Sequence, residues 1–212
     1  MKYYLDITLL PDAEANLGFL WQKVYQQLHL ALVENKVAEN RSAIAISFPK
    51  YGDKAFPLGD KVRLFAEKQE QLIQLDIGNW LNRLTDYVHY TSIKNVPEPI
   101  TKYVCFKRKQ FKSTEKIRVE ADKWAPKLAK KLNKPLEDVL TRLNERKYED
   151  KFTLPFINMM SLSSKQELGL SNNRQFKLFI EKKVANNMKE GVFNCYGLSF
   201  RESEKTATVP WF

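Results

Sequence analysis

Two histidines are the residues of this chain best suited to acid–base chemistry, because the unperturbed histidine pKa lies near neutral pH. His29 follows Leu28 at the edge of an apolar stripe with helical spacing, so we expect it at the core boundary, within reach of solvent. His89 lies inside the alternating segment 87–93. Either can be an ordinary structural histidine. The functional alternative for His29 is a general base or acid.

A site that cleaves RNA needs few catalytic groups, because RNA carries its own nucleophile in the 2′-hydroxyl. A metal-free ribonuclease needs a proton acceptor, a group that positions the 2′-hydroxyl, and cations for the phosphate. The chain has two cysteines and no CxxC or HExxH pattern, so a structural zinc site is not predicted. Its carboxylates are scattered and it has no glycine-rich phosphate loop. We therefore expect neither a metal nor a cofactor.

The cations are concentrated in one stretch, residues 102–134. Between Lys102 and Lys131 there are eleven Lys or Arg residues and three acidic ones. Residues 101–212 carry 24 basic and 13 acidic side chains, whereas residues 1–100 carry 11 and 12. The whole net charge of +10 therefore comes from the second half. This asymmetry predicts a polyanionic partner, either nucleic acid or an anionic membrane surface. A solvated charged surface is the simpler alternative.

Within this stretch the spacing suggests two kinds of contact. Lys127, Lys130 and Lys131 have i, i+3, i+4 spacing and would share one helix face. Arg108 and Gln110 alternate in KRKQ, and these residue types form bidentate pairs with guanine and adenine edges. The stretch therefore has the charge pattern of a nucleic-acid binder. One form of this hypothesis is a double-stranded DNA binder that places helix 126–133 in the major groove.

Three further residues have both a structural and a functional interpretation. Ser161 follows a predicted strand, where serine commonly forms a turn, and no GxSxG elbow surrounds it. Tyr196 in FNCYGL is by default a packed aromatic. Phe176 in QFKLFI is either a core residue or a platform for base stacking.

Hydrophobic periodicity predicts the helices and strands that must position these residues. In the first half, the pattern predicts strands at 3–10, 42–48, 61–66 and 87–93, and helices at 16–35 and 68–84. The order β-α-β-β-α-β is that of a ferredoxin-like domain, assigned to residues 1–94. The proline-punctuated segment 95–99 is the predicted linker.

Residues 100–212 are predicted to form a second domain, an α+β domain with a basic RNA-binding helix. We expect strands at 100–106, 154–160, 175–181 and 193–198, and helices at about 114–125, 126–133 and 135–146. The fold class is therefore α+β. The N-terminus lacks a signal-peptide pattern, and no apolar run is long enough to span a membrane. We expect a cytoplasmic protein with reduced thiols and no membrane partner.

Several motifs together resemble one protein family. They are YLDITLLPD and QLHLALV near the N-terminus, ISFP and KRKQFKS in the middle, and LPFINMMSLSS, QFKLFI, FNCYGLS and VPWF towards the C-terminus. In this order they resemble the CRISPR-associated repeat-processing endoribonuclease of the subtype I-F (Ypest) system. The resemblance covers most of the chain.

The resemblance implies an activity and partners. Members of that family cut precursor CRISPR RNA at the 3′ base of each repeat hairpin without metal, which leaves a 5′-hydroxyl and a 2′,3′-cyclic phosphate. They then stay on the hairpin as a subunit of the type I-F crRNA surveillance complex. A non-catalytic or very slow subunit that only caps the hairpin is the alternative.

The resemblance also implies roles for individual residues. His29 matches the general base, Ser161 the residue that holds or activates the 2′-hydroxyl, and Tyr196 a group that helps to position His29 or the scissile nucleotide. The implied RNA-binding residues are Arg108 and Gln110 at the foot of the stem, Phe176 on the terminal base pair, and Lys112, Lys127, Lys130 and Lys131. The groove helix of the family is rich in arginine, whereas this chain has lysine, which cannot form arginine's planar fork.

Overall fold

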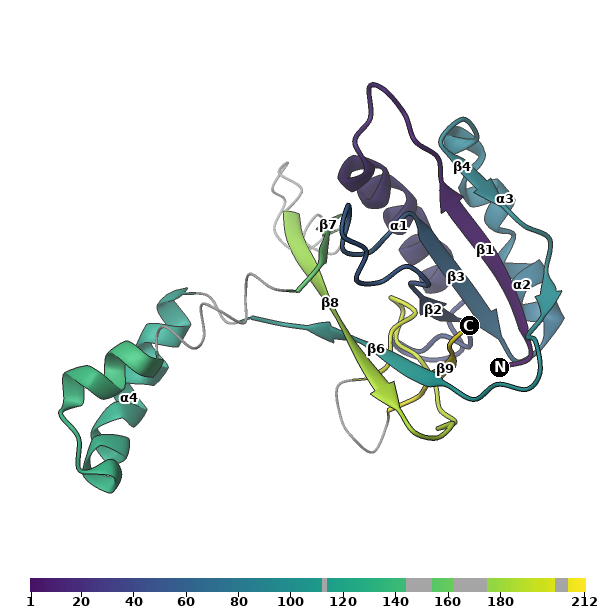
Figure 1. Cartoon of the computed structure of the whole chain (residues 1–212). Coiled ribbons are helices and arrows are strands. Elements are labelled where there is room, and N and C mark those ends of the chain that lie inside the picture. Colours follow the sequence, from purple (N-terminus) through teal and green to yellow (C-terminus); the bar gives the residue numbers. More distant parts are fainter. Residues whose placement is uncertain (112–113, 144–153, 162–174, 201–205) are drawn as a thin grey trace. The chain divides into compact units, whose positions relative to one another are not determined.

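The computed structural model describes residues 1–111, 114–143, 154–161, 175–200 and 206–212, with only the backbone of 114–118 and 120. The chain divides into two compact units, which Figure 1 shows. Unit 1 comprises Met1–Arg108 and Pro155–Phe212, and unit 2 comprises Lys109–Leu154. The described strands and helices together make the predicted α+β class. The boundary at 95–99 stays a prediction.

The first sheet is antiparallel and has the strand order β2-β3-β1-β4, with β5 also paired to β1. Its strands are β1 (Tyr3–Leu9), β2 (Ala45–Ser47), β3 (Lys61–Ala66), β4 (Val88–Tyr90) and β5 (Lys94–Asn95). The strands predicted at 3–10 and 61–66 are confirmed, whereas β2 and β4 are shorter than predicted. β2 begins late because Ser42 pairs with Phe193 of the C-terminal segment instead of with β3.

Helix α1 (Leu17–Glu34) carries His29 and closely matches the helix predicted at 16–35. Asn16 caps its N-terminus, where its side-chain oxygen accepts a hydrogen bond from the Phe19 N–H at 2.9 Å. The apolar stripe packs against β1 and against β7 of the second sheet. Its buried residues are Leu20, Trp21, Val24, Tyr25, Leu28, Ala31 and Leu32. The stripe fixes the rotation of α1 and places His29 at the edge of the core.

The single helix predicted at 68–84 is wrong. The structure has three short helices instead, α2 (Gln69–Leu75), α3 (Ile77–Trp80) and the 3-10 helix η1 (Asn82–Leu84). Asp76 separates α2 from α3 because its φ of +45° is left-handed and cannot continue an α-helix. Gly78 in α3 lies against Tyr90, and a Cβ at this position would come within 2.6 Å of the Tyr90 hydroxyl.

The second sheet has the strand order β7-β8-β6-β9. Its strands are β6 (Tyr103–Lys109), β7 (Phe156–Met160), β8 (Gln175–Ala185) and β9 (Val209–Pro210). β6 lies further along the chain than the predicted strand at 100–106, so Lys107 and Arg108 belong to a strand and not to a loop. Buried residues of both sheets belong to one hydrophobic core, which also includes α1.

Unit 2 contains α4 (Thr114–Leu132), a single helix with Pro126 in its interior. The two separate helices predicted at 114–125 and 126–133 are therefore wrong. Proline cannot donate to the carbonyl four residues earlier, here that of Asp122. Both residues are exposed, so water can replace the missing donor. Residues 136–143 are also helical, within the helix predicted at 135–146.

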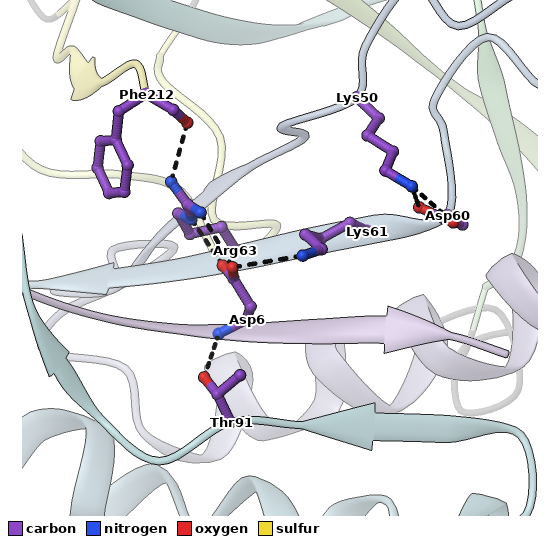
Figure 2. A network of polar contacts seen from close by, with 7 residues as sticks. All are labelled: Asp6, Lys50, Asp60, Lys61, Arg63, Thr91 and Phe212. Carbon is purple, nitrogen blue, oxygen red and sulfur yellow. Dashed lines mark hydrogen bonds and ion pairs between the residues drawn. The ribbon is translucent and has the colours of Figure 1, made fainter.

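A buried ion pair joins β1 and β3 of the first sheet to Phe212, as Figure 2 shows. Arg63 on β3 donates to both carboxylate oxygens of Asp6 on β1, at 2.6 and 2.9 Å, and to the main-chain oxygen of Phe212 at 3.2 Å. Its guanidinium lies 4.6 Å from the ring centre of Tyr4 and 4.0 Å from that of Phe212. The bidentate geometry and the two rings compensate the burial of both charges.

We predict that Arg63→Met lowers the free energy of unfolding by about 3–5 kcal/mol, because it leaves the Asp6 carboxylate buried without its main partner. Lys50→Met is the matched control. It breaks the more exposed pair between Lys50 and Asp60, also drawn in Figure 2, and should cost less than about 1 kcal/mol. Urea unfolding of the three proteins measures both values, and equal losses would contradict this assignment.

Candidate active site

His29 is held by a hydrogen bond to the backbone of a distant segment. Its Nδ1 lies 2.8 Å from the carbonyl oxygen of Cys195. A carbonyl oxygen can only accept, so the proton of the neutral ring is on Nδ1 and the lone pair is on Nε2. The pKa of His29 lies below its usual range, chiefly because the ring is largely buried. The Cys195 carbonyl opposes this lowering of the pKa, and the Arg108 charge adds to it.

The segment that holds His29 is a turn and not the strand predicted at 193–198. The Asn194 side chain accepts hydrogen bonds from the backbone N–H groups of Tyr196 at 2.8 Å and Leu198 at 3.3 Å, which closes the turn. Gly197 has a φ of +69°, and a Cβ there would meet the Ile46 side chain at 2.4 Å. The Gly197 carbonyl accepts from the Ile46 N–H at 2.7 Å, so the turn is anchored on β2.

Tyr196 lies flat against the His29 ring. The ring centres are 4.3 Å apart and the planes differ by 2°. The carbonyl oxygen of Tyr196 accepts a hydrogen bond from the Tyr25 hydroxyl at 2.8 Å, and Tyr25 is one turn before His29 on α1. Burial raises the pKa of Tyr25 well above its usual value, so this hydroxyl stays a neutral donor. Two consecutive carbonyls of the turn are therefore tied to one face of α1.

Arg108 extends the stack from the second sheet. Its guanidinium carbon lies 5.1 Å from the ring centre of Tyr196 and 5.2 Å from that of Phe176. Arg108 comes from β6 and Phe176 from β8, and both side chains are half-buried. The four predicted site residues His29, Tyr196, Arg108 and Phe176 therefore form a continuous group, which we call the His–Arg stack. They come from α1, the 193–198 turn, β6 and β8.

Ser161 directly follows β7 and is half-buried. The residue before it, Met160, donates its backbone N–H to the side-chain oxygen of Gln26 at 3.1 Å. Gln26 lies on α1, three residues before His29, and residues so spaced share a helix face. The strand end that leads to Ser161 is therefore attached to the part of α1 that carries His29.

The other predicted RNA-binding residues belong to unit 2 or lie outside the described residues. Gln110 is exposed just after β6, and Lys112 is outside the described part of the chain. Lys127, Lys130 and Lys131 are exposed on α4 at the spacing that places them on one face. The described residues include no group of three or more His, Cys, Asp or Glu side chains that could hold a metal ion. No helix in the described part is long and apolar enough to cross a membrane.

Sequence reasoning missed Tyr25, Gln26 and the Cys195 carbonyl. A signal for the first two was present, because both lie within one turn of His29 on a strongly apolar helix. The role of a backbone carbonyl 166 residues away had no such signal. A hollow of about 570 Å³ borders another part of α1, near Phe19 and Arg83, and none of the predicted site residues lines it.

Residues 4–212 match the family model described as CRISPR-associated protein (Cas_Csy4). The chain belongs to the Csy4 family. This confirms the resemblance inferred from the motifs. Two relatives of this Csy4-family chain are each named CRISPR-associated endonuclease Cas6/Csy4. The protein from Pseudomonas aeruginosa (strain UCBPP-PA14) is 31% identical over 214 residues, and that from Escherichia coli (strain UTI89 / UPEC) is 34% identical over 218 residues. Both alignments cover 100% of this chain and 100% of the relative.

The His–Arg stack of this Csy4-family protein predicts how the pKa of His29 responds to mutation. Arg108→Met should raise the His29 pKa, because removal of a nearby positive charge favours the imidazolium form. In the unmodified protein the His29 pKa should lie below the usual value of about 6.5. NMR titration of ¹³C-labelled histidine measures both values. Lys107→Met removes a charge from the same strand and is the control. An equal rise in that variant would contradict a specific action of Arg108.

Proposed function

We propose that this protein is a metal-independent endoribonuclease that cleaves precursor CRISPR RNA at the 3′ base of the repeat stem-loop. The observation that carries the proposal is the fixed imidazole of His29, with Nδ1 on the Cys195 carbonyl and one ring face on Tyr196. That arrangement leaves Nε2 as the proton acceptor. The two relatives named as CRISPR-associated endonucleases support the same activity.

In the proposed reaction His29 Nε2 takes the proton of the 2′-hydroxyl next to the scissile phosphate. The resulting 2′-oxygen attacks phosphorus, and the bond from phosphorus to the 5′-oxygen breaks. The leaving 5′-oxygen takes a proton from water and His29 releases its proton to solvent, so the products are a 2′,3′-cyclic phosphate and a 5′-hydroxyl. The low pKa of His29 suits this role, because a neutral ring at neutral pH can accept a proton at once.

The other residues of the site would position the reacting groups. Ser161 would orient the 2′-hydroxyl, and Tyr196 would keep the imidazole in plane by stacking. Arg108 would contact base edges at the foot of the stem, and Phe176 would stack on the terminal base pair. In the free protein the rings of Tyr196 and Phe176 already hold the Arg108 guanidinium, which reduces the entropy lost when RNA binds.

Unit 2 would bind the phosphates of the hairpin. Lys127, Lys130 and Lys131 are exposed on α4 and would neutralise phosphates, with Gln110 and Lys112 close to the stem foot. The protein would stay on the cleaved hairpin as a subunit of the surveillance complex. We also propose that the first half is a ferredoxin-like domain, which its order of elements and the strand order β2-β3-β1-β4 support.

We predict that His29→Ala slows cleavage of repeat RNA by about 10²–10⁴-fold in EDTA, because the general base is lost. Its hairpin affinity should stay within about threefold of the unmodified protein, because phosphate contacts dominate affinity. The measurement is a single-turnover gel assay with end-group analysis of the product. The control is His89→Ala, which keeps His29 and should cleave at the unmodified rate.

Three results would contradict the proposal. If His29→Ala cleaves as fast as the unmodified protein, His29 is not the base. If the unmodified protein binds the hairpin tightly but gives no product in one turnover, it only caps the hairpin. Displacement of bound repeat RNA by duplex DNA at equal concentration would point to a DNA-binding protein.

A further inference from the structure

Gln26 makes a hydrogen bond that has no part in the proposed reaction steps. Its side-chain oxygen accepts the backbone N–H of Met160, the last residue of β7, at 3.1 Å. The two residues are 134 positions apart in the chain, so this bond joins segments that only the fold brings together. It fixes the end of β7 to α1 at the point where the chain continues into Ser161.

Each partner of this hydrogen bond lies close in the sequence to a proposed catalytic residue, His29 or Ser161. Gln26 precedes His29 by three residues on α1, so both side chains leave the same helix face. Met160 precedes Ser161 by one residue, so fixing its N–H restricts the path of the backbone into Ser161. The Gln26 side chain therefore links α1, which carries the proposed base His29, to β7, which leads to Ser161, the proposed contact of the 2′-hydroxyl.

Stability alone gives a weak reason for a glutamine at this position. The other half of its amide, Nε2, is buried and has no hydrogen-bond partner among the described residues. A buried donor without a partner destabilises a protein by at least as much as one ordinary hydrogen bond, such as that to Met160, stabilises it. An apolar side chain of the same length would therefore serve the core about as well. The property that it would lack is the acceptor oxygen facing Met160.

We propose that Gln26 is a positioning residue that sets the place of Ser161 relative to His29 through the Met160 N–H. The inference rests on the proposed function, because it assigns Gln26 a part in that same reaction. In this role Gln26 acts on Ser161 through its hydrogen bond to the end of β7. An error of about 1 Å in the position of a reacting group can cost about 100-fold in rate.

The test compares Gln26→Met with Gln27→Met. Methionine keeps the length and volume of glutamine but has no oxygen to accept the Met160 N–H. Gln27 is the neighbouring glutamine on α1 and is half-buried like Gln26, but among the described residues the hydrogen bond to the end of β7 comes from Gln26. We expect Gln26→Met to slow single-turnover cleavage of repeat RNA by about 10- to 100-fold. Gln27→Met should cleave at the unmodified rate.

Two further readouts separate positioning from loss of structure. Hairpin affinity, measured in the His29→Ala background so that no RNA is cut, should change less than about threefold on adding Gln26→Met. The melting temperature should stay within about 4 °C, because the two effects on stability nearly cancel. A fall in affinity or melting temperature that accounts for the slower cleavage would overturn the inference and assign Gln26 a structural role only.

The decisive experiment is a double variant in which Gln26→Met is combined with Ser161→Ala. If Gln26 acts through Ser161, the second substitution should slow the already slow variant by less than about twofold, because coupled residues are not additive. A full 10- to 100-fold additional loss would overturn the inference. So would a Gln26→Met protein that cleaves at the unmodified rate while Ser161→Ala is slow, and in that case the proposed function stands. If Ser161→Ala itself cleaves normally, the proposed role of Ser161 fails first and the inference with it.

Discussion

The hydrogen bond between His29 Nδ1 and the Cys195 carbonyl is the interaction on which the rest of the site depends. It fixes the tautomer of the imidazole. It also places Tyr196, the residue after Cys195, against the face of the His29 ring. The carbonyl can occupy this position because the turn is closed by Asn194 and anchored to β2 through Gly197. A backbone acceptor has no charge to titrate, so the orientation of His29 does not depend on the ionisation of another side chain.

The same interaction explains why the site needs segments that are far apart in the chain. Helix α1 packs on the first sheet and on β7, and the buried residues of both sheets belong to one core. The His–Arg stack joins α1, strands β6 and β8 of the second sheet and a turn that is anchored to β2 of the first sheet, so it forms only when both sheets are folded. The aromatic rings keep the Arg108 charge close to His29, and that charge lowers the pKa of the ring.

The sequence predicted the elements with strong hydrophobic periodicity and missed features set by backbone geometry. Helix α1 and strand β3 were predicted almost to the residue, because their apolar positions repeat clearly. The break at Asp76 requires a left-handed non-glycine residue, which local propensity does not reveal. Residues 193–198 have β-type side chains, yet Asn194 and Gly197 make them a turn. Pro126 suggested a helix start but lies inside α4, since its exposed position tolerates the missing hydrogen bond.

Motifs identified the candidate site residues, and the fold brings four of them together in the stack, which periodicity alone could not predict. The central claim, that the RNA's own 2′-hydroxyl is the nucleophile presented to His29, is tested most directly with modified RNA. A repeat hairpin with a single 2′-deoxynucleotide on the 5′ side of the scissile phosphate is compared with one deoxygenated at the next position, both in EDTA. The account predicts that the first RNA is bound but not cut and that the second is cut normally. Cleavage of the first RNA at the normal site would contradict it.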